Sequence, residues 1–257
     1  MVRTLSSPAA VADLIPPGAT VAVGGTGLNR KPMALLNGIV AGGVRDLSIV
    51  SILGSVDVEY LLASDAMAEL HSAGVSLDGF GLAPAFRAAR QQQSVRFIEW
   101  SEGSMVAAVE ATARGLPSMP CSTAPGSDVV KHNPSLGVYR DPPTGIPTVF
   151  ATALTIDVAL IHAPAADDHG NIYVDGDLGL DGLVARAAKT TIVSFERQVA
   201  TDPPLAAISR LWIDAVVPAV GGSWPTECHP DALVDLGAIA AWAGSKGLTA
   251  EMLEKAS

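Results

Sequence analysis

Apolar residues recur along the chain with two different periods, so that short strand-like runs alternate with helix-like segments. The strand-like runs are rich in Val, Ile, Leu and Ala, a composition typical of buried strands. They are Thr20–Val23, Leu47–Leu53, Met67–Ser72, Val95–Trp100, Val158–His162, Thr190–Phe195 and Ala215–Ala219. Each of these runs predicts a strand.

The segments between these runs place apolar residues three and four positions apart, the spacing of an amphipathic helix. They are Pro32–Val40, Val56–Ser64, Ala83–Gln91, Glu102–Arg114, Leu180–Lys189, Pro230–Trp242 and Ala250–Ala256. Regular alternation of strand and helix predicts an α/β fold, an open and mainly parallel sheet with helices on both faces. We expect a single domain over residues 1–257.

Residues 118–145 interrupt this pattern. They are rich in Pro, Gly and Ser, carry scattered charge and show no sustained hydrophobic period. Such composition is typical of loops, so we expect a long loop inserted in the domain. Loops of this length in compact domains are usually functional or covered by a partner.

Composition and charge narrow the class of protein. The chain has 257 residues, is 49% hydrophobic and 16% charged, and has a formal net charge of −10. This acidic balance disfavours a nucleic-acid partner, and no apolar run is long enough for a membrane span. The N-terminus makes a poor signal peptide, and two cysteines cannot form a disulfide framework. We therefore expect a cytoplasmic protein with reduced thiols.

The segment Thr20–Leu36 carries the most specific signal in the chain. A β-branched run ends in a glycine-rich turn, Gly24-Gly25-Thr26-Gly27, which the polar residues Asn29, Arg30 and Lys31 follow before Pro32 opens a helix. A strand, a turn without bulky side chains and a helix start bring backbone N–H groups close to an anion or a developing oxyanion.

Three interpretations of this turn compete. It is either a purely structural junction, a dinucleotide-binding turn, or a site for a thioester carbonyl or a CoA phosphate with positive charge from Arg30 and Lys31. The dinucleotide pattern fails, because Arg30 stands where the third glycine is needed. Asp46 also precedes its strand, whereas an acidic ligand of ribose should follow one.

The turn resembles the N-terminal motif of class I CoA-transferase α subunits, particularly the glutaconate type. Further segments are similar to landmarks of that family, in the same order over about the first 200 residues. They are Arg45-Asp46-Leu47, Gly115-Leu116-Pro117, Asp157-Val158-Ala159-Leu160-Ile161-His162, His169-Gly170-Asn171 and Ala187-Ala188-Lys189. The chain departs from the family at Thr26, where Phe is usual, and at Trp224, where a His is usual.

The resemblance implies a CoA-transferase fold and an α subunit that shares its active site with a β subunit, as αβ or α2β2. It implies a CoA thioester as substrate and no permanently bound cofactor. It also implies CoA transfer between carboxylic acids as the leading activity. Two related branches are alternatives: hydrolases that open steroid-derived rings in CoA esters, and decarboxylases of the methylglutaconyl-CoA type. A catalytically silent scaffold is the non-enzymatic alternative.

Glu102 is the candidate for chemistry on this chain. It follows a predicted strand and lies in the first turn of the next helix, so it should lie at the carboxyl end of the sheet, where α/β folds bind ligands. A helix N-terminus favours an ionised carboxylate. However, a glutamate in a first helical turn is also an ordinary capping preference, so a structural role stays open.

The resemblance treats Glu102 in two ways. In true transferases the catalytic glutamate lies on the β subunit. In the α subunits of the ring-opening hydrolases, a functional glutamate occupies an E-x-x-E-G segment, which Glu99-Trp100-Ser101-Glu102-Gly103 resembles.

The remaining polar candidates are weaker. Ser76 and Ser127 lie in turns that are able to line the site. We expect no metal site: Asp167-Asp168-His169 is interpreted as a solvated hairpin turn, since three neighbouring ligands rarely face one ion. Cys121, Cys228 and His229 are expected to be structural.

Overall fold

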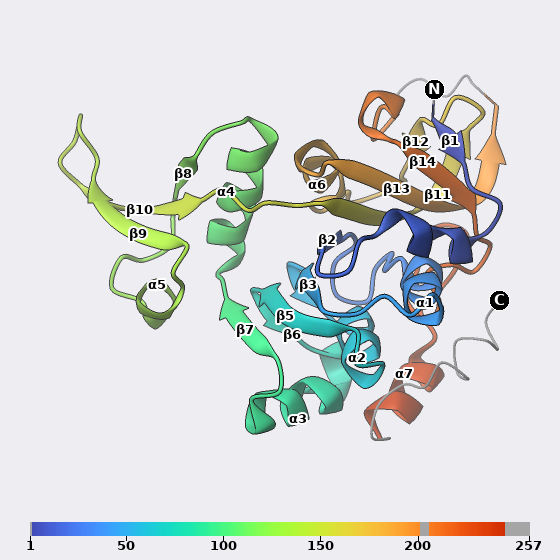
Figure 1. Cartoon of the computed structure of the whole chain (residues 1–257), viewed down its shortest axis with the longest axis horizontal. Coiled ribbons are helices and arrows are strands. Elements are labelled where there is room, and N and C mark those ends of the chain that lie inside the picture. The colour runs from blue at the N-terminus through green and yellow to red at the C-terminus, as the bar shows by residue number, and fades with distance from the viewer. Residues whose placement is uncertain (1, 201–205, 245–257) are drawn as a thin grey trace.

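The computed structural model describes residues 2–200 and 206–244. A nine-stranded sheet forms its centre, with the order β1-β14-β13-β11-β2-β3-β5-β7 and with β12 paired to β11 (Figure 1). All pairings are parallel except that of β12 with β11. The strands are β1 (Arg3–Thr4), β2 (Thr20–Val23), β3 (Leu47–Val50), β5 (Met67–Ser72), β7 (Arg96–Glu99), β11 (Val158–Asp167), β12 (Ile172–Tyr173), β13 (Thr190–Val199) and β14 (Ala215–Pro218).

Helices cover both faces of this sheet, as predicted. The helices are α1 (Met33–Ala41), α2 (Val56–Ala63), α3 (Pro84–Gln92), α4 (Glu102–Ala113), α5 (Asp128–His132), α6 (Asp181–Ala187) and α7 (Leu236–Ala243), with 3-10 turns η1 (Pro8–Leu14), η2 (Asp78–Phe80) and η3 (Arg210–Trp212). Successive sheet residues belong alternately to two buried clusters, one with α1 and α2 and the other with α4 and α6. The two-residue strands β4 (Leu53–Gly54) and β6 (Gly74–Val75) pair beside the sheet.

The alternation on β2 shows how sequence sets the two cores. Val21 and Val23 face the first cluster, whereas Ala22 faces the second. Side chains on a strand point to opposite faces in turn. All ten residues of β11 are buried, which is typical of a central strand in a parallel sheet covered on both faces.

The prediction of a loop over 118–145 is wrong. This region folds as β8 (Ser118–Cys121), α5 and β9 (Leu136–Arg140), and with β10 (Pro147–Thr152) it makes a three-stranded antiparallel sheet. It extends away from the main sheet as an arm (Figure 1). Short strands rich in Pro and Gly carry too little periodicity to be distinguished from a loop.

Most predicted element boundaries agree with the structure to within a few residues. The predicted strand Val158–His162 continues to Asp167. The predicted helix Pro230–Trp242 begins only at Leu236, because residues 228–232 form a tight turn. The predicted helix Ala250–Ala256 lies outside the described residues. Within them, no helix has the length and apolar character that crossing a bilayer requires.

Candidate functional site

The glycine turn joins the carboxyl end of β2 to α1 and forms a tight hairpin at its tip. The backbone N–H groups of Thr26 and Asn29 each donate to the carbonyl of the other, at 3.0 Å. Gly25 has φ +70°, and a Cβ there would lie 2.3 Å from the carbonyl oxygen of Asn29. Only glycine fits this position, because the conformation is left-handed and the backbone approaches closely.

The turn's amides are largely satisfied inside the protein. Gly24 N–H donates to Leu160 O, Gly25 N–H to Asp181 Oδ1 and Gly27 N–H to Leu53 O, at 2.8, 2.8 and 3.1 Å. The backbone N–H groups of residues 24–31 all donate to acceptors within the described part of the chain, except that of Leu28. Leu28 N–H is therefore the turn's candidate backbone donor for an oxyanion.

Arg30 and Lys31 do not present free positive charge beside the turn, contrary to prediction. Arg30 Nη2 lies 2.9 Å from Asp181 Oδ2, with the two side chains 4% and 1% exposed. Lys31 Nζ lies 3.1 Å from Asp57 Oδ2, and both side chains are fully buried. Burial raises the pKa of the Asp181 carboxyl, and the adjacent Arg30 guanidinium opposes that rise. Both cations fasten the turn to neighbouring helices.

A cleft of about 660 Å³ opens beside the tip of the turn. Its walls are mainly apolar, and the polar side chains that line it include Asn29, Asp78 and Glu227. Glu227 is tied to the turn through its backbone, since Arg30 N–H donates to Glu227 O at 2.8 Å and Glu227 N–H donates to Leu28 O at 3.0 Å. The apolar walls come from Leu28, Leu53, Phe80, Val234 and Leu236.

Glu102 is the first residue of α4, directly beyond the carboxyl end of β7. It is exposed, and within the described part of the chain its carboxylate has no hydrogen-bond or ion-pair partner. Ser101 caps the helix by accepting from Ser104 N–H at 3.2 Å, so Glu102 is not needed as a cap. The glycine turn follows β2 and Glu102 follows β7, and these two strands are three strand spacings apart in the sheet, about 14 Å.

The two serine candidates, Ser76 and Ser127, lie in different parts of the fold. Ser76 Oγ accepts from Asp78 N–H at 3.0 Å, so it orients a residue of the cleft without lining the cleft itself. Ser127 precedes α5 on the arm, and its buried Oγ has no hydrogen-bond partner in the described structure. Ser76 therefore lies next to a residue of the cleft, whereas Ser127 lies on the arm, at the start of α5.

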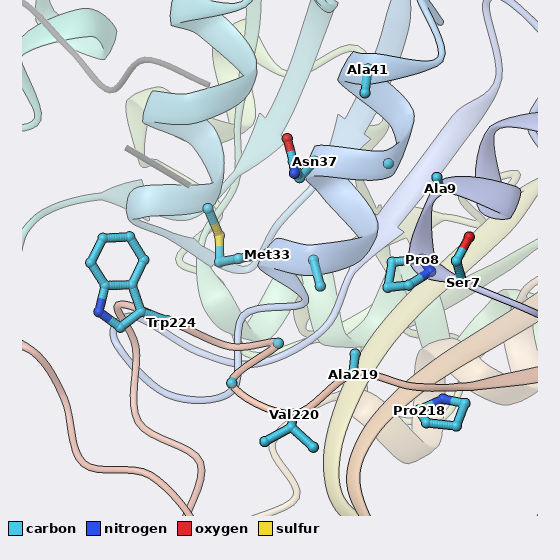
Figure 2. Close-up of a pocket in the computed structure, with 14 residues that line it drawn as sticks. Ser7, Pro8, Ala9, Met33, Asn37, Ala41, Pro218, Ala219, Val220 and Trp224 are labelled. Carbon is cyan, nitrogen blue, oxygen red and sulfur yellow. The ribbon is translucent and has the colours of Figure 1, made fainter. Parts of the chain in front are cut away.

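A second pocket, of about 370 Å³, shares no lining residue with the cleft. Figure 2 shows Met33, Asn37 and Ala41 of α1 on one wall, with Ser7–Ala9 and Pro218–Val220 opposite and Trp224 at its side. Asn37 Oδ1 accepts from Tyr60 Oη at 2.9 Å. This pocket suits an apolar group and offers an anion no charged partner from its described lining.

His162, Glu196 and Cys228 form a buried polar cluster that sequence reasoning missed. His162 Nδ1 contacts Ser194 Oγ at 2.8 Å and Nε2 contacts Glu196 Oε1 at 2.9 Å. Burial alone would raise the pKa of Glu196, but hydrogen bonds from His162 and from Gly221 N–H lower it below its ordinary value.

The ligand atoms of His162, Glu196 and Cys228 lie within 4.8 Å of one another. However, burial and the nearby Glu196 raise the pKa of Cys228 to about 12. His162 Nε2 and Glu196 Oε1 are already engaged in a hydrogen bond with each other. The Cys228 thiol is therefore protonated in this arrangement. Through Glu196 the cluster supports the Gly221–Gly222 turn.

Comparison with known proteins identifies the class. Residues 4–219 match the coenzyme A transferase family, and the chain belongs to that family. It is 33% identical over 229 residues to the cholesterol ring-cleaving hydrolase IpdA subunit of Mycobacterium tuberculosis, covering 83% of this chain and 78% of the relative. A 34% identical protein of Archaeoglobus fulgidus aligns with 89% of this chain, which spans about half (51%) of that protein's length.

Solved structures agree. The decarboxylase AibA/AibB variant has a TM-score of 0.90 at 33% identity, with 99% of this chain and 98% of that chain covered. Glutaconate coenzyme A-transferase from Acidaminococcus fermentans also has a TM-score of 0.90 and shares the fold at 23% identity, with 98% and 86% covered. The predicted family, fold and enzyme class, with transferase, hydrolase and decarboxylase members, are confirmed.

Proposed function

We propose that this chain is the α subunit of a heteromeric enzyme that acts on an acyl-CoA thioester, with CoA transfer between carboxylic acids as its reaction. The observation that carries the proposal is the glycine turn with its cleft at the carboxyl edge of a sheet of the CoA-transferase family. The relatives are named as subunits of larger enzymes. We propose an αβ or α2β2 assembly in the cytoplasm, with no permanent cofactor and no nucleic-acid or membrane partner.

In CoA transfer, a carboxylate attacks the thioester carbonyl and expels CoA as a thiolate, which leaves a mixed anhydride. The CoA thiolate then attacks the carbonyl of the enzyme's carboxyl group, so the donor acid departs and CoA is held as an enzyme thioester. We assign this nucleophile to the partner subunit. Leu28 N–H at the turn would donate to the carbonyl oxygen as negative charge develops there.

A second candidate function is hydrolysis of a CoA ester, including hydrolytic ring opening, with Glu102 as general base. A specific observation favours it: Glu102 is an exposed carboxylate without a partner in the described structure, and it lies at the carboxyl end of the sheet, as the turn does. A carboxylate placed in this way is able to accept a proton from an attacking water. Acyl-CoA decarboxylation is the remaining alternative, and the 33% identity to the AibA/AibB structure supports it.

The decisive experiment uses the enzyme co-purified with its partner and follows acyl-CoA thioesters by mass spectrometry, with and without a carboxylic acid acceptor. Transfer gives a new acyl-CoA only when the acceptor is present. Hydrolysis gives an acceptor-independent product that has gained water, and decarboxylation gives one that has lost carbon dioxide. If none of a broad set of acyl-CoA thioesters changes, the proposal is overturned.

Glu102→Gln in the same complex tests the second candidate. If Glu102 is the general base, we expect turnover to fall by ~10²–10⁴-fold, the usual contribution of such a group. Glu110→Gln, on the same helix and in a surface ion pair with Arg114, is the matched control. Full activity in Glu102→Gln assigns the chemistry to the partner subunit and supports transfer. Hydroxylamine trapping of a partner glutamate during turnover would support transfer independently.

A further inference from the structure

A short junction, residues 99–101, connects β7 to Glu102, and hydrogen bonds from other elements hold it in place. Trp100, its middle residue, is buried; its N–H donates to Ser72 O at 3.0 Å and its Nε1–H donates to His71 Nδ1 at 3.2 Å. The junction is therefore fixed to β5. The carboxylate of Glu102 has no partner in the described structure, so the backbone that carries it sets its position.

The arm holds the residue that directly precedes Glu102. Ser101 caps α4, and its Oγ contacts Thr123 Oγ1 of the arm at 2.6 Å. Ser101 donates its single hydroxyl hydrogen to Ser104 Oγ at 3.0 Å, since Ser104 donates its own to Ser101 O. Thr123 is then the donor to Ser101 Oγ. Thr123 thereby orients the capping hydroxyl at the start of α4.

A second contact from the arm holds the other end of the junction. Asn133, the C-cap of α5, is 3% exposed, and its Nδ2 donates to Glu99 O at 2.8 Å. Its Oδ1 accepts from Ser135 N–H at 2.9 Å, which fixes the orientation of the amide. The arm also lies against the first turn of α4, because a Cβ built on Gly103 would lie 3.3 Å from Ser122 Oγ.

Such anchoring matters for a general base, which must lie about 2.6–3.2 Å from the proton that it accepts. A misplacement of about 1 Å can cost about 100-fold in rate. We propose that Thr123 and Asn133 are positioning residues, which hold Glu102 where it takes a proton from the attacking water as the water oxygen bonds to the substrate carbonyl carbon. The inference rests on the second candidate function, in which Glu102 is that base.

The test uses Thr123→Val in the enzyme co-purified with its partner, because valine keeps the volume of threonine and removes the hydroxyl. Turnover is followed as the product that has gained water, on the acyl-CoA thioester that the wild-type complex hydrolyses fastest. We expect kcat to fall by about 10–100-fold with KM nearly unchanged. Thr123→Ser keeps the donor and should recover most of the loss. Asn133→Ala should lower kcat in the same way.

Thr112→Val is the matched control. Thr112 Oγ1 donates to Leu154 O at 2.6 Å, so this variant also loses a hydroxyl hydrogen bond of α4, but in the last turn of the helix, away from Glu102. Its kcat should equal the wild-type value. A fall in kcat as large as that of Thr123→Val would overturn the inference, since any lost hydroxyl on this helix would then have the same effect.

The Glu102→Gln background separates positioning from a general loss of structure. If Thr123 acts through Glu102, Thr123→Val should not lower kcat further in that background, whereas a purely structural contact would lower it by the same factor in both. An equal loss in both backgrounds, or full activity of Thr123→Val beside an impaired Glu102→Gln, overturns the inference and leaves the candidate function standing. Full activity of Glu102→Gln overturns the second candidate function, and the inference with it.

Discussion

At the scale of single residues, three acids in first helical turns have different roles. Asp57 in α2 pairs with Lys31, and Asp181 in α6 pairs with Arg30, whereas Glu102 in α4 is exposed and unpaired in the described structure. From sequence alone all three look like capping residues. Their partners separate them: two hold the glycine turn in place, and the third is available for chemistry.

Lys31→Met should be strongly destabilising, because it leaves the Asp57 carboxylate buried without its cation. The expected loss in the free energy of unfolding is about 3–5 kcal/mol, as for other broken buried pairs. Urea denaturation of the variant measures it. Adding Asp57→Asn should recover part of the loss, since the amide carries no charge. A loss below about 1 kcal/mol, the value of an exposed pair, would contradict this account.

His71 should make stability depend on pH. Trp100 Nε1–H donates to His71 Nδ1 at 3.2 Å, and Nε2 contacts Glu69 at 2.8 Å, so the ring is neutral with its proton on Nε2. Burial lowers the pKa of His71 below its ordinary value, more than Glu69 raises it. As pH falls from about 6.5 toward 5, the unfolded state gains a proton that the folded state does not bind, so the free energy of unfolding decreases.

His71→Gln checks this assignment, because glutamine keeps an acceptor for Trp100 and a donor for Glu69 but does not titrate. The slope of the free energy of unfolding against pH, measured between about pH 6.5 and 5, should become smaller in the variant. An unchanged slope would assign the pH dependence to other groups.

At the scale of elements, the glycine turn depends on backbone geometry more than on side chains. Gly25→Ala should destabilise the fold far more than Gly43→Ala, although both residues have φ of +70° or +75°. A Cβ at Gly25 meets the backbone of Asn29 and Arg30, whereas nothing lies within 4 Å of one at Gly43. We expect a loss of about 1–2 kcal/mol for Gly43→Ala, from the left-handed conformation alone.

Thermal unfolding of the two variants measures the difference. We expect Gly25→Ala to lose at least about 2 kcal/mol more free energy of unfolding than Gly43→Ala, as at other strongly strained sites. Equal losses at the two glycines would mean that the turn rearranges without cost. The account of a rigid turn would then be wrong.

Element order was predictable from sequence because strands buried on both faces and amphipathic helices have strong periodicity. The arm was not, since β8, β9 and β10 are short and antiparallel and carry Pro and Gly. The turn's position was also predictable, but its electrostatics were not. Asp181 and Arg30 are 151 residues apart in the sequence, so no local sequence pattern predicts that they pair. Likewise, Glu227 enters the cleft only through tertiary contacts.

At the scale of the whole molecule, positive charge is scarce where a CoA thioester would bind. The chain has a net charge of −10, and the described lining of the cleft includes no Lys, Arg or His. CoA carries several phosphate charges, so we expect the partner subunit to supply their cations. On this proposal the thioester would lie between unlike subunits, with the turn and the acidic cleft on this chain.

The most direct test is a crystal structure of the assembled enzyme with an unreactive thioether analogue of acyl-CoA. We predict that the sulfur lies at the subunit interface beside the tip of the glycine turn, with the acyl chain between Leu28 and Glu227 and the phosphates on the partner. An analogue bound away from this cleft, or a cleft filled by the partner's own side chains, would contradict it.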